Sequence, residues 1–174
     1  GGLIEYTGTG TGNQLVLTGG GAATGTNNNH GIRVSNATVR STQSGDISLT
    51  GTGAGSGTDN EGLRLDAIGI VASGGSATIS LTGTGGAGTS GNDGVHVTGA
   101  GSRVTSTAAG SGAISVVGTG GQGGSASTGN SGVVIDSAGR IESLASGAAA
   151  TITISGTGGL GTNSNYGVAI DGAS

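Results

Sequence analysis

The chain contains no cysteine, proline, methionine, tryptophan, phenylalanine or lysine, and only two of its 174 residues are tyrosine. Without cysteine, neither a disulfide framework nor a thiolate metal site can form. The five basic residues are all arginine and are scattered, so no cluster could neutralise a run of phosphates. This argues against nucleic acid and against an anionic membrane surface as partners.

Long apolar runs are also missing. No segment approaches the roughly 18 apolar residues of a membrane span, so direct membrane insertion is not expected. The opening sequence GGLIEYTGTG lacks the basic and apolar regions of a signal peptide. If the protein is exported, we expect its signal to lie outside this chain.

Glycine accounts for 44 residues, and nine scattered carboxylates give a formal net charge of −4. Chains this rich in Gly, Ser and Thr usually bury too little apolar surface to offset the entropy cost of ordering, so composition alone predicts disorder. The order of the residues predicts the opposite, because aliphatic residues recur at regular intervals.

Three short motifs recur five times each in a fixed order. The first is an aliphatic pair one residue apart followed by Thr, Ser and Gly, and its copies begin at residues 15, 47, 79, 114 and 152. The second is Asn-x-Gly followed by an aliphatic pair, as in NEGLRL from Asn60. The third is a single aliphatic residue among Ser and Thr, which precedes each first motif; its copies are Ile4, Val39, Ile70, Val104 and Ile141.

Each motif alternates apolar and polar residues as a half-buried strand does, and none has helical spacing. Three short strands per repeat predict an all-β parallel β-helix, or β-solenoid, of about five coils. Right-handed coiling is favoured because right-handed crossovers between parallel strands predominate. Equivalent residues of neighbouring coils then stack about 4.8 Å apart. The residues expected to point inward within one coil are Ile47, Leu49, Leu63, Leu65 and Ile70.

The asparagine of the second motif is present in every copy. A buried amide at a turn can donate to the coil on one side and accept from the coil on the other, which predicts a structural asparagine ladder. The glycine two positions later is expected to allow positive φ or a tight bend into the strand. The ladder comprises Asn29, Asn60, Asn92, Asn130 and Asn165, and the turn glycines are Gly31, Gly62, Gly94, Gly132 and Gly167.

Threonine recurs at two outward positions of the first motif. Such columns on a flat sheet resemble the ice-binding surface of hyperactive antifreeze solenoids, although threonine also favours strands and forms ladders without any ligand. One column is interrupted by Val117. Ice binding is therefore an alternative function, and the possible threonine face consists of Thr50, Thr52, Thr82, Thr84, Thr119 and Thr157.

Residues suited to catalysis are few. His30 and His96 are expected to face solvent, and no Ser-His-acid set is suggested by spacing. Asp66, Asp136 and Asp171 follow the second motif at equivalent positions. Parallel β-helix polysaccharide lyases and hydrolases place acidic residues on one face, so a carbohydrate-active enzyme is a second alternative. The chain lacks the long insertions and the clustered basic and aromatic residues with which such enzymes grip sugar.

Two segments, GTDNEG and TSGNDG, superficially resemble calcium-binding nonapeptide repeats. Those repeats need a period of nine residues, whereas the period here exceeds thirty. We therefore expect no enzymatic activity, no cofactor and no bound metal.

The two ends of the chain lie at matching points of the repeat. Residues 171–174 match residues 136–139, and GGLIEY matches AGRIES. Neither end carries the polar cap that keeps solenoids soluble. We expect residues 1–174 to form a single β-solenoid segment, a window of a longer array, which alone is marginally stable or associates end to end.

The recurring LTGTGG…NxGVxI pattern resembles the β-strand repeats of large bacterial surface proteins, the filamentous-haemagglutinin-like and autotransporter-like adhesins. The resemblance spans the whole chain and rests on composition. It implies an extracellular or cell-surface rod or filament with a structural or adhesive function. The implied partners are further copies of the repeat array, cell-surface glycans or other cells.

Overall fold

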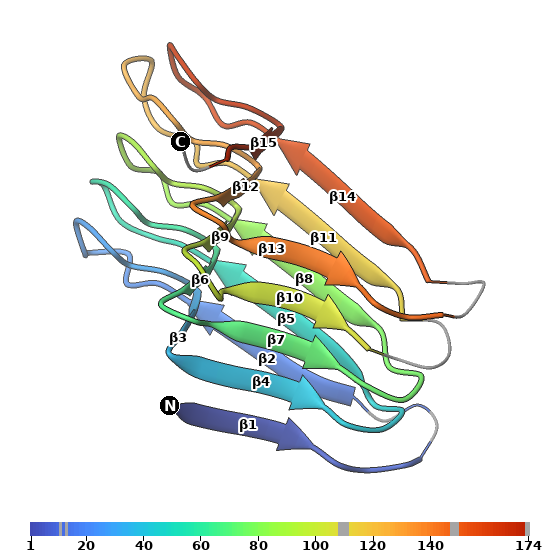
Figure 1. Ribbon diagram of the computed structural model, residues 1–174. Coiled ribbons are helices and arrows are strands. Elements are labelled where there is room, and N and C mark those ends of the chain that lie inside the picture. The colour runs from blue at the N-terminus through green and yellow to red at the C-terminus, as the bar shows by residue number, and fades with distance from the viewer. Residues whose placement is uncertain (11, 13, 108–111, 147–149, 173–174) are drawn as a thin grey trace.

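Five coils stack into a solenoid in the computed structural model, which describes residues 1–10, 12, 14–107, 112–146 and 150–172 (Figure 1). All regular secondary structure in these residues is β-strand, and the strands form three parallel sheets of five strands each. Each coil contributes one strand to each sheet, so hydrogen-bonded neighbours come from consecutive coils. The predicted parallel β-solenoid of five three-stranded coils is confirmed.

The three sheets are named A, B and C in the order in which the first coil visits them. Sheet A consists of β1 (Gly2–Tyr6), β4 (Ala37–Ser41), β7 (Ile70–Ser73), β10 (Arg103–Ser106) and β13 (Arg140–Ser143). Sheet B consists of β2 (Gln14–Gly20), β5 (Asp46–Thr52), β8 (Ile79–Thr84), β11 (Ile114–Thr119) and β14 (Ile152–Thr157). Sheet C consists of β3 (Ile32–Ser35), β6 (Leu63–Asp66), β9 (Val95–Thr98), β12 (Val133–Asp136) and β15 (Val168–Ile170).

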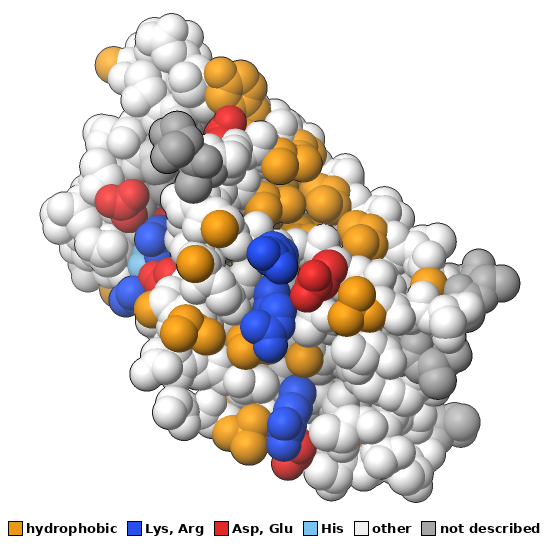
Figure 2. Space-filling view, in the orientation of Figure 1, with side chains coloured by type: hydrophobic (Ala, Val, Ile, Leu, Met, Phe, Trp, Pro, Cys, Tyr) orange, Lys and Arg blue, Asp and Glu red, His pale blue; other side chains and the backbone are white. Residues whose placement is uncertain are grey.

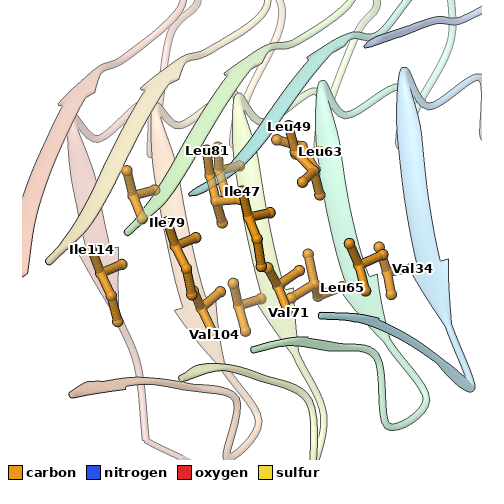
Figure 3. Close-up of a cluster of buried hydrophobic side chains, with 14 of the residues drawn as sticks. Val34, Ile47, Leu49, Leu63, Leu65, Val71, Ile79, Leu81, Val104 and Ile114 are labelled. Carbon is orange, nitrogen blue, oxygen red and sulfur yellow. The ribbon is translucent and has the colours of Figure 1, made fainter. Parts of the chain in front are cut away.

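Aliphatic side chains stack in columns inside the coils (Figure 3). Ile47 pairs with Ile79, and Leu49 with Leu81, so each column continues from coil to coil. Leu49 is 0% exposed, and its burial contributes about 1.5–3 kcal/mol. In the last coil the inward Ile170 is 71% exposed, because β15 has a neighbouring strand on one side only.

One of the predicted inward residues is wrong. Ile70 is in register with Arg103 on the outer side of sheet A, and its neighbour Val71 is the fully buried residue, in register with Val104. The segment GIVAS has two consecutive aliphatic residues, so its alternation alone does not decide which one points inward. The adjacent strands decide it, because Val39 and Val104 both pair with Val71.

Sheet A also places a polar column inside the coils. Ser41, Ser73 and Ser106 are in register and at most 2% exposed. The Ser73 hydroxyl donates to the Ser106 hydroxyl at 3.0 Å. Serine is small, and its hydroxyl can both donate and accept a hydrogen bond, as Ser73 and Ser106 do with each other where sheet A meets the corner leading to sheet B.

Long loops connect sheets B and C and project together from one side of the rod (Figure 1). They are held to one another by parallel bridges that run from Thr58 to Ser90, Thr128 and Asn163 in successive coils. The stacking of coils therefore extends into the loops. The connections from sheet C to sheet A are much shorter. Between β3 and β4 the connection is a single residue, Asn36.

Candidate functional site

The five ladder asparagines lie in one column, where the long loops return toward sheet C. The Oδ1 atom of each of the last four accepts a hydrogen bond from the backbone N–H of the ladder asparagine in the preceding coil, at 2.9–3.1 Å. Asn60, Asn92 and Asn130 are 0% exposed. The side chains therefore accept hydrogen bonds from backbone N–H groups of the ladder. A buried N–H group without an acceptor would destabilise the fold.

The amide nitrogens of the ladder are used in more than one way. Asn130 Nδ2 donates forward to Leu160 O at 3.4 Å, whereas Asn60 Nδ2 donates backward to Thr26 O at 3.0 Å. Donation to one side and acceptance from the other therefore describes Asn130, while Asn60 makes both bonds to the preceding coil.

Positive φ occurs one residue before each ladder asparagine and not at the glycine two residues after it. The residues concerned are Asn28, Asp59, Gly91, Gly129 and Ser164, with φ between 56° and 64°. The sequence predicts positive φ or a tight bend at the five second-motif glycines; none of them has positive φ, and each of them lies at a bend. Asparagine and aspartate tolerate the left-handed conformation better than other non-glycine residues, which fits their use in the first two coils.

Close approach of backbones, in contrast, explains those glycines. A Cβ atom on Gly62 would overlap the backbone nitrogen of Thr84, and one on Gly83 would overlap the carbonyl oxygen of Gly94. The same contact recurs in the other coils. Two glycine columns, one at the end of sheet B and one at the start of sheet C, thus pack backbone against backbone.

The predicted threonine face covers the outer side of sheet B. Thr50 is in register with Thr82, and Thr52 with Thr84, Thr119 and Thr157. Val117 interrupts the first column and is 43% exposed. A third outward column, which the predicted threonine face does not include, lies two residues earlier and contains Ser48, Ser80, Ser115 and Thr153.

The outer side of sheet A carries three of the five arginines, visible as a line of basic side chains across its face (Figure 2). Arg103 and Arg140 occupy adjacent strands in register. Arg40 is paired with Glu5, with its Nε 2.6 Å from Oε1. Apart from this line, the face is mostly uncharged.

A cluster of charged side chains, which we call the ionic cluster, covers the outer side of sheet C. Its members come from the first four coils. They are His30, Arg33, Glu61, Arg64, Asp66, Asp93, His96 and Asp136.

Glu61 is the most deeply buried member, with a side chain 1% exposed. Its Oε2 lies 2.5 Å from His30 Nδ1, and its Oε1 accepts a hydrogen bond from Arg64 and lies 3.4 Å from His96 Nδ1. Three side chains from three successive coils thus surround one carboxylate.

Two further carboxylates face His96. Asp93 Oδ2 lies 3.8 Å from His96 Nδ1, and Asp136 Oδ2 lies 3.3 Å from the other ring nitrogen, Nε2. Asp93 Oδ1 accepts the backbone N–H of Ser131 at 2.7 Å. The imidazole is thus held between coils by acidic groups on both of its nitrogens.

The remaining carboxylate of the cluster, Asp66, joins two arginines. It lies 2.8 Å from Arg33 Nη2, and it accepts a hydrogen bond from Arg64 Nε at 2.7 Å. Burial opposes its ionisation, but hydrogen bonds from Arg33, Ser35 and Arg64 lower the pKa of Asp66 to about 2.

The pKa values of Asp93 and Glu61, the two carboxylates beside His96 Nδ1, shift in opposite directions. It raises the pKa of Asp93 to about 7, because the Ser131 N–H and the charge of His96 offset only part of the desolvation. For Glu61 the hydrogen bonds with His30 and His96 and the charge of Arg64 outweigh desolvation, so the pKa of Glu61 lies well below its usual range.

The pKa values of His96 itself and of Asp136 also shift. Burial disfavours the charged imidazole, but the hydrogen bond with Glu61 and the charges of Asp93 and Asp136 raise the pKa of His96. Desolvation of Asp136 is outweighed by hydrogen bonds from Thr98 and by the charge of His96, which lower the pKa of Asp136.

The expectation that both histidines face solvent is wrong. The side chains of His30 and His96 are only 6% and 14% exposed. His96 does lie on the outer side of sheet C, but the carboxylates of neighbouring coils enclose it. A signal was present in the sequence for His96, since it shares one position of the repeat with Arg33 and Arg64, two residues before the position that holds Asp66 and Asp136.

Of the three equivalent aspartates predicted after the second motif, Asp66 and Asp136 belong to the ionic cluster, and Asp171 is exposed after β15. Ser35 pairs with Asp66, and Thr98 with Asp136, as the repeat predicted.

No protein-family model, curated protein or solved structure matches this chain. Within the described residues, there is no helix of the length and apolarity that crossing a membrane would require.

Proposed function

We propose that this chain is a structural or adhesive repeat module of an extracellular or cell-surface rod. The observation that carries the proposal is the in-register stacking of five coils through all three sheets. Each coil offers the next one the same strand edges, aliphatic columns and asparagine column. Such an architecture gains length by adding coils without changing its cross-section.

Rod formation is tested by comparing the single chain with a tandem duplication in which residue 174 is followed by a second residue 1. Each added coil extends a parallel solenoid by about 4.8 Å, so five more coils lengthen the rod by about 24 Å at constant width. Small-angle X-ray scattering measures both dimensions. A duplication that widens, or that behaves as two bodies joined by a flexible linker, would contradict the proposal.

Surface location and adhesion need their own measurement. On cells that produce this chain, antibodies raised against it should label the outside without permeabilisation. Beads coated with the chain should bind other cells or glycan arrays above beads coated with the same chain unfolded. Labelling that appears only after permeabilisation would count against a surface role, and equal binding by both bead types against adhesion.

Ice binding is a second candidate function, favoured by the third hydroxyl column on sheet B. Three outward columns made mostly of Ser and Thr, interrupted by Val16 and Val117, form a hydroxyl array whose spacing follows the parallel strands. The array predicts thermal hysteresis that is lost in Thr84→Lys and Thr119→Lys. Thr38→Lys is the matched control, because Thr38 pairs with Ile70 on the outer side of sheet A. Absence of hysteresis in the unmodified chain would remove this candidate.

A further inference from the structure

With all of its carboxylates ionised and its histidines neutral, the ionic cluster carries two more negative than positive charges. Four carboxylates, those of Glu61, Asp66, Asp93 and Asp136, face two arginines, Arg33 and Arg64. The two histidines are the only other titratable members. Buried charge without compensation is costly, so the cluster needs further positive charge, from protons on the histidines or from a cation.

The geometry around His96 allows a metal cation to take the place of a proton on the ring. A neutral imidazole carries a proton on one nitrogen only. When Nε2 donates to Asp136 Oδ2, 3.3 Å away, Nδ1 presents a lone pair to Glu61 Oε1 and Asp93 Oδ2. Three electron-pair donors then converge on one point, which is repulsive unless a proton on Nδ1 or a metal cation lies between them.

Asp93 supplies a second, independent observation. Its side chain is 7% exposed. Its Oδ1 accepts the Ser131 N–H, while Oδ2 has no partner closer than His96 Nδ1 at 3.8 Å, which is beyond hydrogen-bond distance. The second oxygen of this largely buried side chain thus faces the imidazole without a hydrogen bond to it.

The distances suit a small divalent ion. One ligand atom from each of Glu61, Asp93 and His96 lies within 4.8 Å of the other two. Ligands held at about 2.0–2.2 Å in a tetrahedron are about 3.4 Å apart, and Glu61 Oε1 lies 3.4 Å from His96 Nδ1.

We propose that Glu61 Oε1, Asp93 Oδ2 and His96 Nδ1 bind one divalent transition-metal cation of the Zn²⁺ class. An imidazole with two carboxylates is a ligand set that Zn²⁺ accepts, and a water molecule completes four-coordination. Asp136 orients the imidazole through Nε2, which is the carboxylate–histidine–metal arrangement. The ion ties the second coil to the third, and Asp136 extends the tie to the fourth. This site stands independently of the proposed function.

The test is titration of the chelator-treated chain with ZnCl₂ at pH 7.5 by calorimetry, with Co²⁺ absorption as a probe of coordination and Mg²⁺ as a hard-cation control. We expect one Zn²⁺ per chain, tetrahedral Co²⁺ bands and no comparable Mg²⁺ binding. Asp136→Asn should weaken Zn²⁺ binding about 10–100-fold, and Asp93→Asn at least tenfold.

Asp46→Asn is the matched control, because Asp46 Oδ1 also accepts a backbone N–H, that of Thr78 at 2.7 Å, but lies outside the cluster. It should bind Zn²⁺ as the unmodified chain does. The proposal is overturned if the unmodified chain takes up no Zn²⁺, or if Asp93→Asn binds it as tightly as Asp46→Asn.

The ring nitrogens of His96 allow the site to be tested in the unmodified chain, so this test does not depend on whether a variant folds. In ¹⁵N spectra at constant pH, one equivalent of Zn²⁺ should shift Nδ1 to the metal-bound range while Nε2 keeps its proton. A His96 ring that stays doubly protonated in the presence of Zn²⁺ means that protons alone balance the cluster, which would refute the site.

Discussion

Asp66 is the residue where arginines of two neighbouring coils meet. Arg33 approaches it from the first coil and Arg64 from its own, and both make hydrogen bonds to its carboxylate. Such a carboxylate is more acidic in the folded chain than in the unfolded one, so it links stability to pH.

The resulting pH dependence has a defined sign. The pKa of Asp66 is about 2 in the folded chain and about 3.9 in an unfolded one, so its stabilisation is present above about pH 4 and is lost as pH falls toward 2. After allowance for solvent screening, about 1 kcal/mol is at stake. Urea unfolding at pH 5 and pH 2.5 should show a smaller stability difference in Asp66→Asn than in the unmodified chain.

Asp46→Asn is again the control, because the carboxylate of Asp46 has no arginine partner among the described contacts. If Asp66→Asn and the unmodified chain lose equal stability on acidification, the two arginines do not hold Asp66 ionised.

The two glycine columns pack the ends of the sheet B strands against the starts of the sheet C strands. The glycine near the end of each sheet B strand lies against the glycine that precedes a sheet C strand, as Gly83 lies against Gly94. No side chain separates the two backbones there, which lets the chain turn from one face to the next within a narrow cross-section.

Gly83→Ala should therefore destabilise the solenoid strongly. Its methyl group would overlap a carbonyl oxygen in a backbone that is fixed by β-sheet hydrogen bonds, and overpacking costs about 1–3 kcal/mol, with backbone clashes at the upper end. Thermal unfolding followed by circular dichroism should show a markedly lower midpoint. Gly20→Ala is the matched control, since Gly20 ends β2 with no atom within 4 Å of the added methyl group.

Equal midpoints for Gly83→Ala and Gly20→Ala would show that the backbones separate easily. The packing of glycine on glycine would then be incidental to the fold.

The whole molecule is a linear stack, so stability should vary along it. Strands of the third coil are paired on both sides and enclose residues such as Val71, Leu81 and Val95 that are 0% exposed. Strands of the first and fifth coils are paired on one side, and their inward Ile4 and Ile170 are largely exposed. Coils of a solenoid interact only with their neighbours, so the ends can open without the middle.

Native-state hydrogen exchange should reveal this gradient. Amides of β8 and β9 should exchange most slowly, and those of β1–β3 and β13–β15 fastest, with protection falling coil by coil. Uniform protection in all five coils would mean that the stack opens as one cooperative unit. In the tandem duplication, the protected region should extend across the junction.

The sequence by itself determined the architecture, because three motifs repeated five times leave few ways to bury 25 regularly spaced aliphatic residues other than stacked coils. It also located the asparagine column and the threonine columns, since each occupies one fixed position of the repeat. Where two aliphatic residues are adjacent, as at Ile70 and Val71, periodicity could not choose, and pairing with Val39 and Val104 decided.

Only the tertiary structure decided what the charged residues do. His30, Glu61 and Asp93 follow their ladder asparagines at positions that are serine and tyrosine in other coils, so no repeated signal marks them. Stacking brings residues more than thirty positions apart to about 3 Å and seals them from water. The period predicts which residues are neighbours in a column. How deeply these residues are buried, and which charged groups contact one another, depends on how the coils fold around them.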